Sequence, residues 1–230
     1  MRYDGNAAIK VTMRILGCLA LAAVLVPLSL PQSHRRNSGA PSAPGVFDYY
    51  LLSLSWAPDF CAGPNGRQDS LECAPGRRVG FVVHGLWPQL DNGDHPSQCA
   101  KARPVAQDIV KGTLPYIPDP GLIQHEWRDH GTCSGLSPAA YFDTVRRAAD
   151  SVKIPDEFRQ LNQRITDSPR DIAAKFVAAN PGLRESIRVT CSGGELAEVR
   201  VCLGKDLSPH ACGVHDSNCP APSVTILPLR

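Results

Sequence analysis

The sequence lacks three patterns that would point to common kinds of chemistry. None of its nine cysteines forms a C-x-x-C pair, the spacing typical of zinc and dithiol sites. It has no G-x-S-x-G segment, which would place a nucleophilic serine, and no G-x-x-x-x-G-K-[ST] phosphate loop. These absences argue against a cysteine-bound metal, a serine hydrolase of that type and a P-loop enzyme.

The sequence also has little excess positive charge. The whole chain has a formal net charge of +2 at pH 7. Residues 1–36 hold five Lys and Arg and one Asp, which leaves 19 basic and 21 acidic residues, a net charge of −2, for the remainder. Proteins that bind nucleic acid through bulk charge carry a basic surface. Any contact with nucleic acid must therefore come from a local site.

No apolar run is long enough for a comfortable membrane span. The uncharged run from Ile15 to Leu30 follows three basic residues, Arg2, Lys10 and Arg14. This layout is typical of a signal peptide, with an uncleaved N-terminal anchor as the alternative. We predict a signal or anchor over 1–30, a Pro/Ser/Gly-rich linker over 31–46 and one domain over 47–230.

Eight cysteines remain when Cys18 is removed with the predicted signal. An even number favours an exported, disulfide-bonded domain, although eight cysteines allow 105 pairings and the count fixes none of them. We therefore expect a secreted or cell-envelope protein that has no stable membrane association after the signal is removed.

The spacing of apolar residues predicts strands first. Strands are expected over Phe47–Trp56 and over Val79–His84, with Gly85 ending the second strand. Residues 88–103 are polar and turn-prone, so they predict a long loop.

Helices are expected next, and then strands again. Ser137-Pro138 and Ser168-Pro169 each resemble an N-cap followed by proline at the first helical position, and a shorter helix is expected at about 156–165. Alternating apolar residues then predict the closing strands, at 187–191, 199–203 and 224–227. This order predicts an α+β fold.

Three of the seven histidines occur in unusual company. His84 follows an apolar strand, where a hydrogen-bonded core histidine is the ordinary interpretation. His125 and His130 flank Glu126, but their spacing is not the i, i+4 spacing of a zinc-protease helix. Five residues on a helix place two rings roughly 140° apart. We therefore expect no metal to be held by both rings and favour acid–base chemistry.

Two segments, FVVHGLWPQ (81–89) and HEWRDHGTCSG (125–135), resemble the two active-site segments of the ribonuclease T2 family. SWAPDFC (55–61) is similar to that family's first strand and the cysteine after it. The resemblance covers about 47–230 and reverses the interpretation of His84 from structural to catalytic. It implies an α+β fold with a central, mainly antiparallel sheet flanked by helices and stapled by disulfides.

The resemblance implies that the chain is an endoribonuclease that cleaves single-stranded RNA without a metal or other cofactor. The ribose 2′-OH attacks the adjacent phosphorus to give a 2′,3′-cyclic phosphate, which is then hydrolysed to a 3′-phosphate. His130 is the expected base and His84 the expected acid, with Glu126 as the third catalytic residue. His125 and Arg128 are expected to bind the phosphate, and Trp87 a base.

The resemblance also implies four disulfides. They are Cys99–Cys133, Cys191–Cys219, Cys202–Cys212 and, from the two cysteines that remain, Cys61–Cys73. The expected partner is RNA alone, bound by a monomer. A disulfide is preferred for Cys133 over a nucleophilic thiol because the expected chain is exported.

The chain departs from the family pattern at Asp129, where the family usually has Lys. A carboxylate there repels phosphate, so either Asp129 points away and Arg128 takes its place, or activity is reduced. Beside His130, it is also expected to raise the pKa of that histidine and to shift the pH optimum upward. Gln89 and Ser55 also differ from relatives, so no base preference can be transferred, and His95 is expected to be a solvated loop histidine. Two alternatives follow: a binding module that has lost activity, and a metal-dependent hydrolase using His84, His125 and His130.

Overall fold

The structure, a computed structural model, describes residues 43–64, 66, 70–213 and 218–230. The predicted signal or anchor over 1–30 and most of the predicted linker over 31–46 lie outside these residues. Among the residues that are described, no helix has the length and apolar character needed to cross a membrane.

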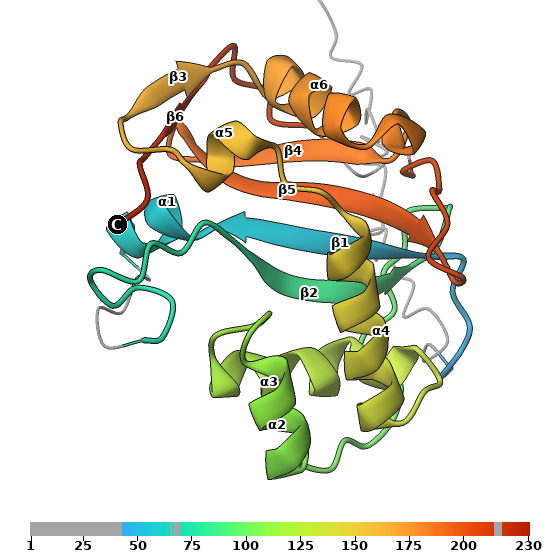
Figure 1. Cartoon of the computed structure of the whole chain (residues 1–230). Helices are drawn as coiled ribbons and strands as arrows, with labels where there is room; N and C mark the ends of the chain where they lie inside the picture. The colour runs from blue at the N-terminus through green and yellow to red at the C-terminus, as the bar shows by residue number, and fades with distance from the viewer. Residues whose placement is uncertain (1–42, 65, 67–69, 214–217) are drawn as a thin grey trace, which may run out of the picture. The chain divides into compact units, whose positions relative to one another are not determined.

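A six-stranded sheet forms the centre of the domain (Figure 1). Its strands are β1 (Tyr49–Trp56), β2 (Phe81–Gln89), β3 (Ile165–Asp167), β4 (Ile187–Ser192), β5 (Glu195–Gly204) and β6 (Val224–Ile226). The order across the sheet is β2-β1-β5-β6-β3, and β4 also pairs with β5. Every pairing is antiparallel except that of β5 with β6, so the sheet is mainly antiparallel as expected.

Helices cover one face of this sheet, the near face in Figure 1. The helices are α1 (Ala57–Ala62), α2 (Gln107–Thr113), α3 (Pro120–Asp129), α4 (Pro138–Ser151), α5 (Asp156–Arg159) and α6 (Pro169–Ala179). Short 3-10 turns occur at Gly131–Cys133 and Pro181–Leu183. α4 packs on β1 and β2, and α6 packs on β4. The side chains of Asp119, Ser137 and Ser168 cap α3, α4 and α6, each followed by a proline that suits the first helical turn.

β2 contains a bulge, which changes how its side chains alternate between the two faces of the sheet. Ser53 of β1 pairs with Gly85 and Leu54 pairs with Val83, which leaves His84 as an extra residue in β2. Val83 and Leu86 both lie in the main hydrophobic core, although they are three positions apart. A bulge re-aims the side chains of a strand. Here it shifts the alternation after His84, so that Leu86 returns to the core and Trp87 shares the face of His84 away from the core.

The strand and helix predictions were largely confirmed, with three corrections. β2 does not end at Gly85 but continues to Gln89, because the bulge absorbs His84 without breaking the pairing with β1. The helix expected at about 156–165 is only α5, and its last residues enter β3 instead. Helices α1, α2 and α3 were not predicted, since short capped helices carry little apolar periodicity.

The described residues contain four disulfides. They join Cys61 to Cys73, Cys99 to Cys133, Cys191 to Cys219 and Cys202 to Cys212. These are the pairs that the resemblance implied. The Cys99–Cys133 bond ties the loop after β2 to the turn after α3, so it links the two segments that carry the histidines.

Candidate active site

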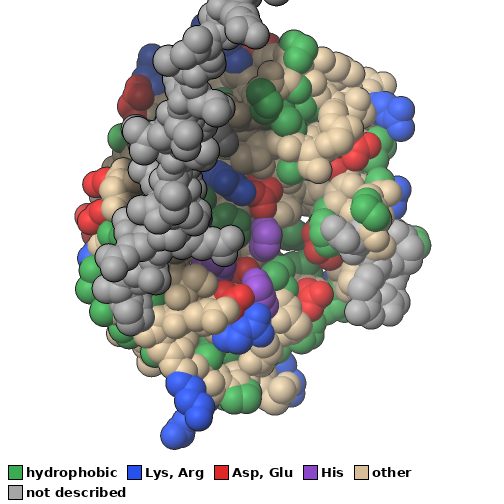
Figure 2. Space-filling model, turned by 180° about the vertical axis from the view of Figure 1, so that it is seen from behind, with side chains coloured by type: hydrophobic (Ala, Val, Ile, Leu, Met, Phe, Trp, Pro, Cys, Tyr) green, Lys and Arg blue, Asp and Glu red, His purple; other side chains and the backbone are tan. Residues whose placement is uncertain are grey.

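Histidine, acidic and basic side chains gather in a hollow on the face of the domain opposite the helices (Figure 2). Three elements contribute to this site: β2, the C-terminal end of α3, and β5. The structure brings together His84, Trp87, Glu126 and His130, which lie up to 46 residues apart in the sequence. The sequence-predicted catalytic residues therefore form one site.

His84 is held between two carboxylates. Its Nδ1 lies 2.7 Å from Oε1 of Glu198, and its Nε2 lies 4.0 Å from Oε1 of Glu126. Burial lowers the pKa of His84, but the hydrogen bond to Glu198 and the charges of both carboxylates outweigh it. The pKa of His84 is therefore raised above its ordinary value. This environment favours a protonated imidazole.

Glu126 packs directly against Gly85, in space that any larger side chain at position 85 would occupy. It is 1% exposed, and its Oε2 accepts a 2.8 Å hydrogen bond from Trp87 Nε1. A Cβ built on Gly85 would lie 2.1 Å from that same oxygen, so a side chain there would displace Glu126. Burial raises the pKa of Glu126 to about 7, against the opposing effects of His84 and Trp87. Its Oε1 has no hydrogen-bond partner among the described residues.

Trp87 lies between His84 and His130 and contacts both rings. Its ring centroid lies 5.1 Å from that of His84 and 5.4 Å from that of His130. The guanidinium carbon of Arg200 lies 5.4 Å from the same ring, in cation–π range. These contacts give Trp87 a packing role, and its predicted role in base binding stays a prediction.

His125 and His130 lie closer together than an uninterrupted helix would allow. α3 ends at Asp129, and His130 has φ −120° and ψ −46°, outside helical geometry. Their ring centroids are 6.3 Å apart, and ligand atoms of His125, Glu126 and His130 all lie within 4.8 Å of one another. The prediction that the spacing keeps a metal from both rings was therefore wrong, because it assumed that the helix continues. The three side chains have donors and a separation that suit a metal such as zinc.

His130 differs from His84 in its protonation. Burial, and after it the neighbouring charge of His125, lower the pKa of His130 to about 4. Asp129 acts in the opposite direction, as predicted, but its effect is smaller than that of burial. His130 is thus neutral over most of the physiological range and can accept a proton. The exposed His95 adds only the weakest of these effects.

Asp129 does not point away from the cationic side chains. Its carboxylate accepts hydrogen bonds from Arg128 Nε at 2.8 Å and from Gln98 Nε2 at 3.1 Å, and it lies 3.0 Å from Nδ1 of His125. The hydrogen bond from Arg128 is the main reason that the pKa of Asp129 is lowered. Arg128 and His125 are both exposed at the rim, so Asp129 restrains the two side chains predicted to bind phosphate.

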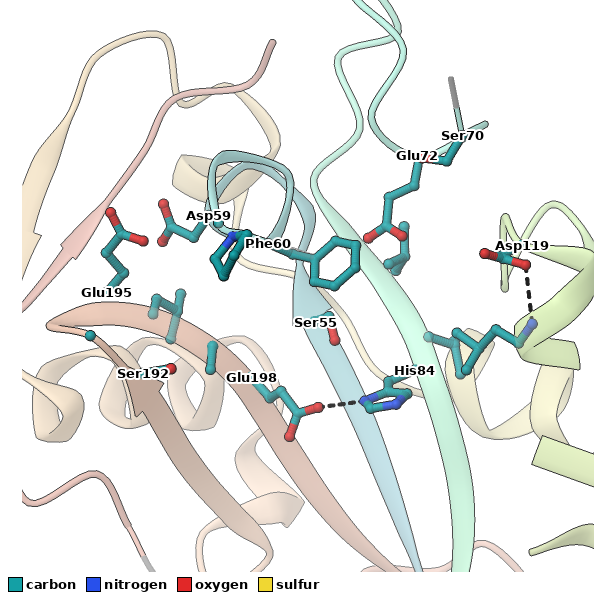
Figure 3. A pocket seen from close by; sticks show the side chains of 18 residues that line it. Ser55, Asp59, Phe60, Ser70, Glu72, His84, Asp119, Ser192, Glu195 and Glu198 are labelled. Carbon is teal, nitrogen blue, oxygen red and sulfur yellow. Dashed lines mark hydrogen bonds and ion pairs between the residues drawn. The ribbon is translucent and has the colours of Figure 1, made fainter. Parts of the chain in front are cut away.

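Sequence reasoning missed two residues of the site, Glu198 and Arg200. Both lie on β5, in a stretch identified only as an alternating strand. A cavity of about 480 Å³ adjoins His84 and Glu198, and its lining includes Ser55, Glu72 and Leu122 (Figure 3). Glu198 offered one signal, a charged residue directly before the alternating apolar positions of β5, a strand that also carries Glu195 and Arg200.

The fold and the site define an α+β domain that gathers two histidines and a buried carboxylate around one tryptophan. The family model of the ribonuclease T2 family matches residues 47–212. The chain belongs to the ribonuclease T2 family, and its enzyme class is that of the T2-type endoribonucleases.

The similar proteins are ribonucleases or a ribonuclease-related protein by name. The chain is 34% identical over 177 residues to a ribonuclease of Aeromonas hydrophila, covering 70% of this chain and 74% of that protein. It is 30% identical over 214 residues to ribonuclease DdI of Dictyostelium discoideum, covering 84% and 89% of the two chains. Among solved structures, an RNase-related protein from Calystegia sepium superposes with a TM-score of 0.65 at 27% identity, covering 80% of this chain and 98% of that one.

Proposed function

We propose that this protein cleaves single-stranded RNA by attack of the ribose 2′-OH on the adjacent phosphorus, without a metal. The products are a 2′,3′-cyclic phosphate and then a 3′-phosphate. The observation that carries the proposal is the opposite protonation of two neighbouring histidines, His84 with a raised pKa and His130 with a pKa of about 4. The reaction needs one base and one acid, because its nucleophile is already held beside the phosphorus.

His130 is the base of the proposed first step. With a pKa of about 4 its imidazole is neutral at neutral pH, so the unprotonated ring nitrogen can accept the proton of the 2′-OH. The new bond forms between the 2′ oxygen and phosphorus as that proton leaves.

His84 is the acid. The phosphorus–5′ oxygen bond breaks with its electron pair on the oxygen, and His84 supplies the proton that the oxygen needs. The raised pKa keeps this proton on His84 at higher pH than an ordinary histidine would. In the hydrolysis of the cyclic phosphate the two histidines exchange roles, with water as the nucleophile.

The remaining predicted site residues act on the phosphate. Glu126, with a pKa of about 7, is partly protonated near neutrality and can donate a hydrogen bond to a phosphate oxygen. His125 and Arg128 supply donors at the exposed rim, where a phosphate can reach them. DNA lacks the 2′-OH and is not a substrate in this scheme.

We also propose that the protein acts outside the cytoplasm, after secretion or in the cell envelope. Four disulfides within one domain support this, because such bonds persist in oxidising compartments. We further propose that it acts as a monomer with RNA as its partner.

A metal-dependent reaction is the second candidate, because His125, Glu126 and His130 lie close enough to share an ion. The purified protein is incubated with RNA in EDTA, and cyclic-phosphate ends are sought. Cleavage in EDTA that is lost in His84→Ala and in His130→Ala is the expected result. Cleavage only after metal is restored favours the metal-dependent reaction. No cleavage at any pH, with or without metal, favours a binding module.

A further inference from the structure

Glu198 is a buried carboxylate whose role neither histidine segment explains. It lies on β5 and is 8% exposed. One oxygen, Oε1, meets Nδ1 of His84 at 2.7 Å. The other, Oε2, accepts hydrogen bonds from Arg200 Nε at 2.8 Å and from an Arg200 terminal nitrogen at 2.7 Å. Both oxygens are thus occupied, so the carboxylate has one defined orientation.

The contact between Glu198 and His84 crosses over β1, the strand between their own two strands. β1 lies between β2 and β5, and its Ser53 and Ser55 pair with Arg200 and Glu198. Figure 3 shows Glu198 reaching from β5 toward His84 on β2, with the short side chain of Ser55 nearby. Serine leaves the space above β1 that a larger side chain would fill.

A second bulge accompanies the first. Thr190 of β4 pairs with Glu198 and Cys191 pairs with Leu196, which leaves Ala197 as an extra residue in β5. Each partner of the contact therefore lies at or beside a bulge on its own strand. Bulges often occur next to active sites, where they redirect a side chain.

We propose that Glu198, anchored by Arg200, is a positioning residue that holds His84 with Nδ1–H toward the carboxylate and Nε2 toward the substrate. This inference rests on the proposed role of His84 as the acid. Nε2 is the nitrogen on the side of Glu126, so it faces the centre of the site.

The proton balance follows from this orientation. The imidazolium donates Nδ1–H to Glu198 throughout, and its Nε2–H bond breaks as the proton passes to the departing 5′ oxygen. The electron pair of that bond stays on Nε2, so His84 becomes the neutral Nδ1–H tautomer. In the hydrolysis step this lone pair accepts a proton from water. Glu198 itself transfers no proton, and His84 with Arg200 holds its pKa at about 2 despite burial.

Other charged groups face His84 and act on the same titration. Glu126 on α3 favours the protonated form, whereas Arg200 on β5 opposes it. Glu72, before β2, interacts electrostatically with His84, and so does His130. Only Glu198 combines charge with a hydrogen bond to a ring nitrogen, so its removal affects tautomer as well as pKa.

The test is Glu198→Gln, which keeps size and removes charge, compared with Glu195→Gln, which removes a carboxylate from the same strand without touching His84. In Glu198→Gln we expect kcat/KM to fall roughly tenfold, less than the complete loss of a general acid. The fall is in kcat, with KM little changed, and the alkaline limb of the pH profile moves to lower pH. Glu195→Gln leaves kcat and the alkaline limb unchanged. Glu198→Asp retains the charge, so its alkaline limb stays close to that of the wild type.

An ¹⁵N NMR titration of His84 gives a second result that needs no activity. In the wild type we expect the Nδ1–H tautomer at high pH, and a mixed tautomer with a lower pKa in Glu198→Gln. An unmoved alkaline limb in Glu198→Gln, or the Nε2–H tautomer in the wild type, overturns the positioning role while the proposed function stands. If the wild type cleaves no RNA, the proposed function fails and the NMR titration still decides the contact. If Glu198→Gln does not fold, the wild-type tautomer decides.

Discussion

His84 and His130 touch the same tryptophan but are built into the protein in opposite ways. His84 stands on a bulged strand of the sheet, where a carboxylate binds its Nδ1 and raises its pKa. His130 follows the last turn of α3, where burial and the neighbouring His125 lower its pKa to about 4. The comparison teaches that the sheet and the helix end shift the pKa of the same residue type in opposite directions because they supply different neighbours.

The largest expected effect comes from removing either histidine. His84→Ala and His130→Ala should each lower kcat/KM for RNA by about 10²–10⁴, the usual contribution of general acid or base catalysis. A nucleoside 3′-(4-nitrophenyl phosphate) sharpens the comparison, because its leaving group departs without a proton. On this substrate His84→Ala should recover most of its loss and His130→Ala should not. Recovery in His130→Ala alone would reverse the assignment of base and acid.

The second effect concerns Gly85, where β2 and α3 meet. Gly85→Ala places a Cβ against Glu126 and Trp87 Nε1, and such overpacking costs roughly 1–3 kcal/mol. Urea unfolding measures the loss, and activity should fall with it because the Trp87–Glu126 hydrogen bond is disturbed. Gly112→Ala in α2 is the matched control, since nothing lies within 4 Å of its Cβ. Equal stability of the two variants would show that the close approach has no cost.

The pH profile of kcat/KM tests the environments of His84 and His130 together. The base requires neutral His130, a form present above its pKa of about 4 and lost as the pH falls through it. The acid requires protonated His84, a form present below its raised pKa and lost as the pH rises through it. We expect kcat/KM to fall about tenfold per pH unit beyond each limb. An acidic limb near the ordinary histidine pKa would contradict the buried, neutral state of His130.

The smallest expected effect is at Asp129. Asp129→Asn removes a negative charge that restrains Arg128 and His125, so both should bind phosphate more freely. We expect KM for RNA to fall by about twofold to fivefold, the size typical of an exposed ion pair, with kcat nearly constant. Asp129→Lys, which restores the family's usual cation, should act in the same direction. A rise in KM in both variants would instead give Asp129 a supporting role.

The sequence identified the residues around His130 but did not predict how the end of α3 places them. The histidines and Glu126 were identified because they lie in two contiguous segments, and the disulfide partners were implied by the family resemblance of the chain. The separation of His125 and His130 was misjudged because an uninterrupted helix was assumed, although Gly131, directly after the C-cap residue His130, is a helix-stop signal. Whether a helix continues for one more residue is decided by tertiary packing, here by the turn that carries Cys133.

On the sheet side, the sequence identified His84 but not its partner. Glu198 lies 114 residues from His84, and their contact depends on strand order and on two bulges. Strand order is not encoded in the alternation of a single strand, so local patterns could not bring the two residues together. An alternation that skips a step, as it does after Val83, was the one local sign that the strand is irregular.

That skipped step gives the spacing of the first histidine segment a structural meaning. In an unbroken strand, side chains that share a face are separated by an even number of positions. His84 and Trp87 are three positions apart and yet in contact, which requires one residue too many in the ladder. The three-position spacing of His84 and Trp87 therefore indicates the one extra residue in β2. A regular ladder through the same residues, with no bulge, would send the indole into the core, away from the histidine that it now touches.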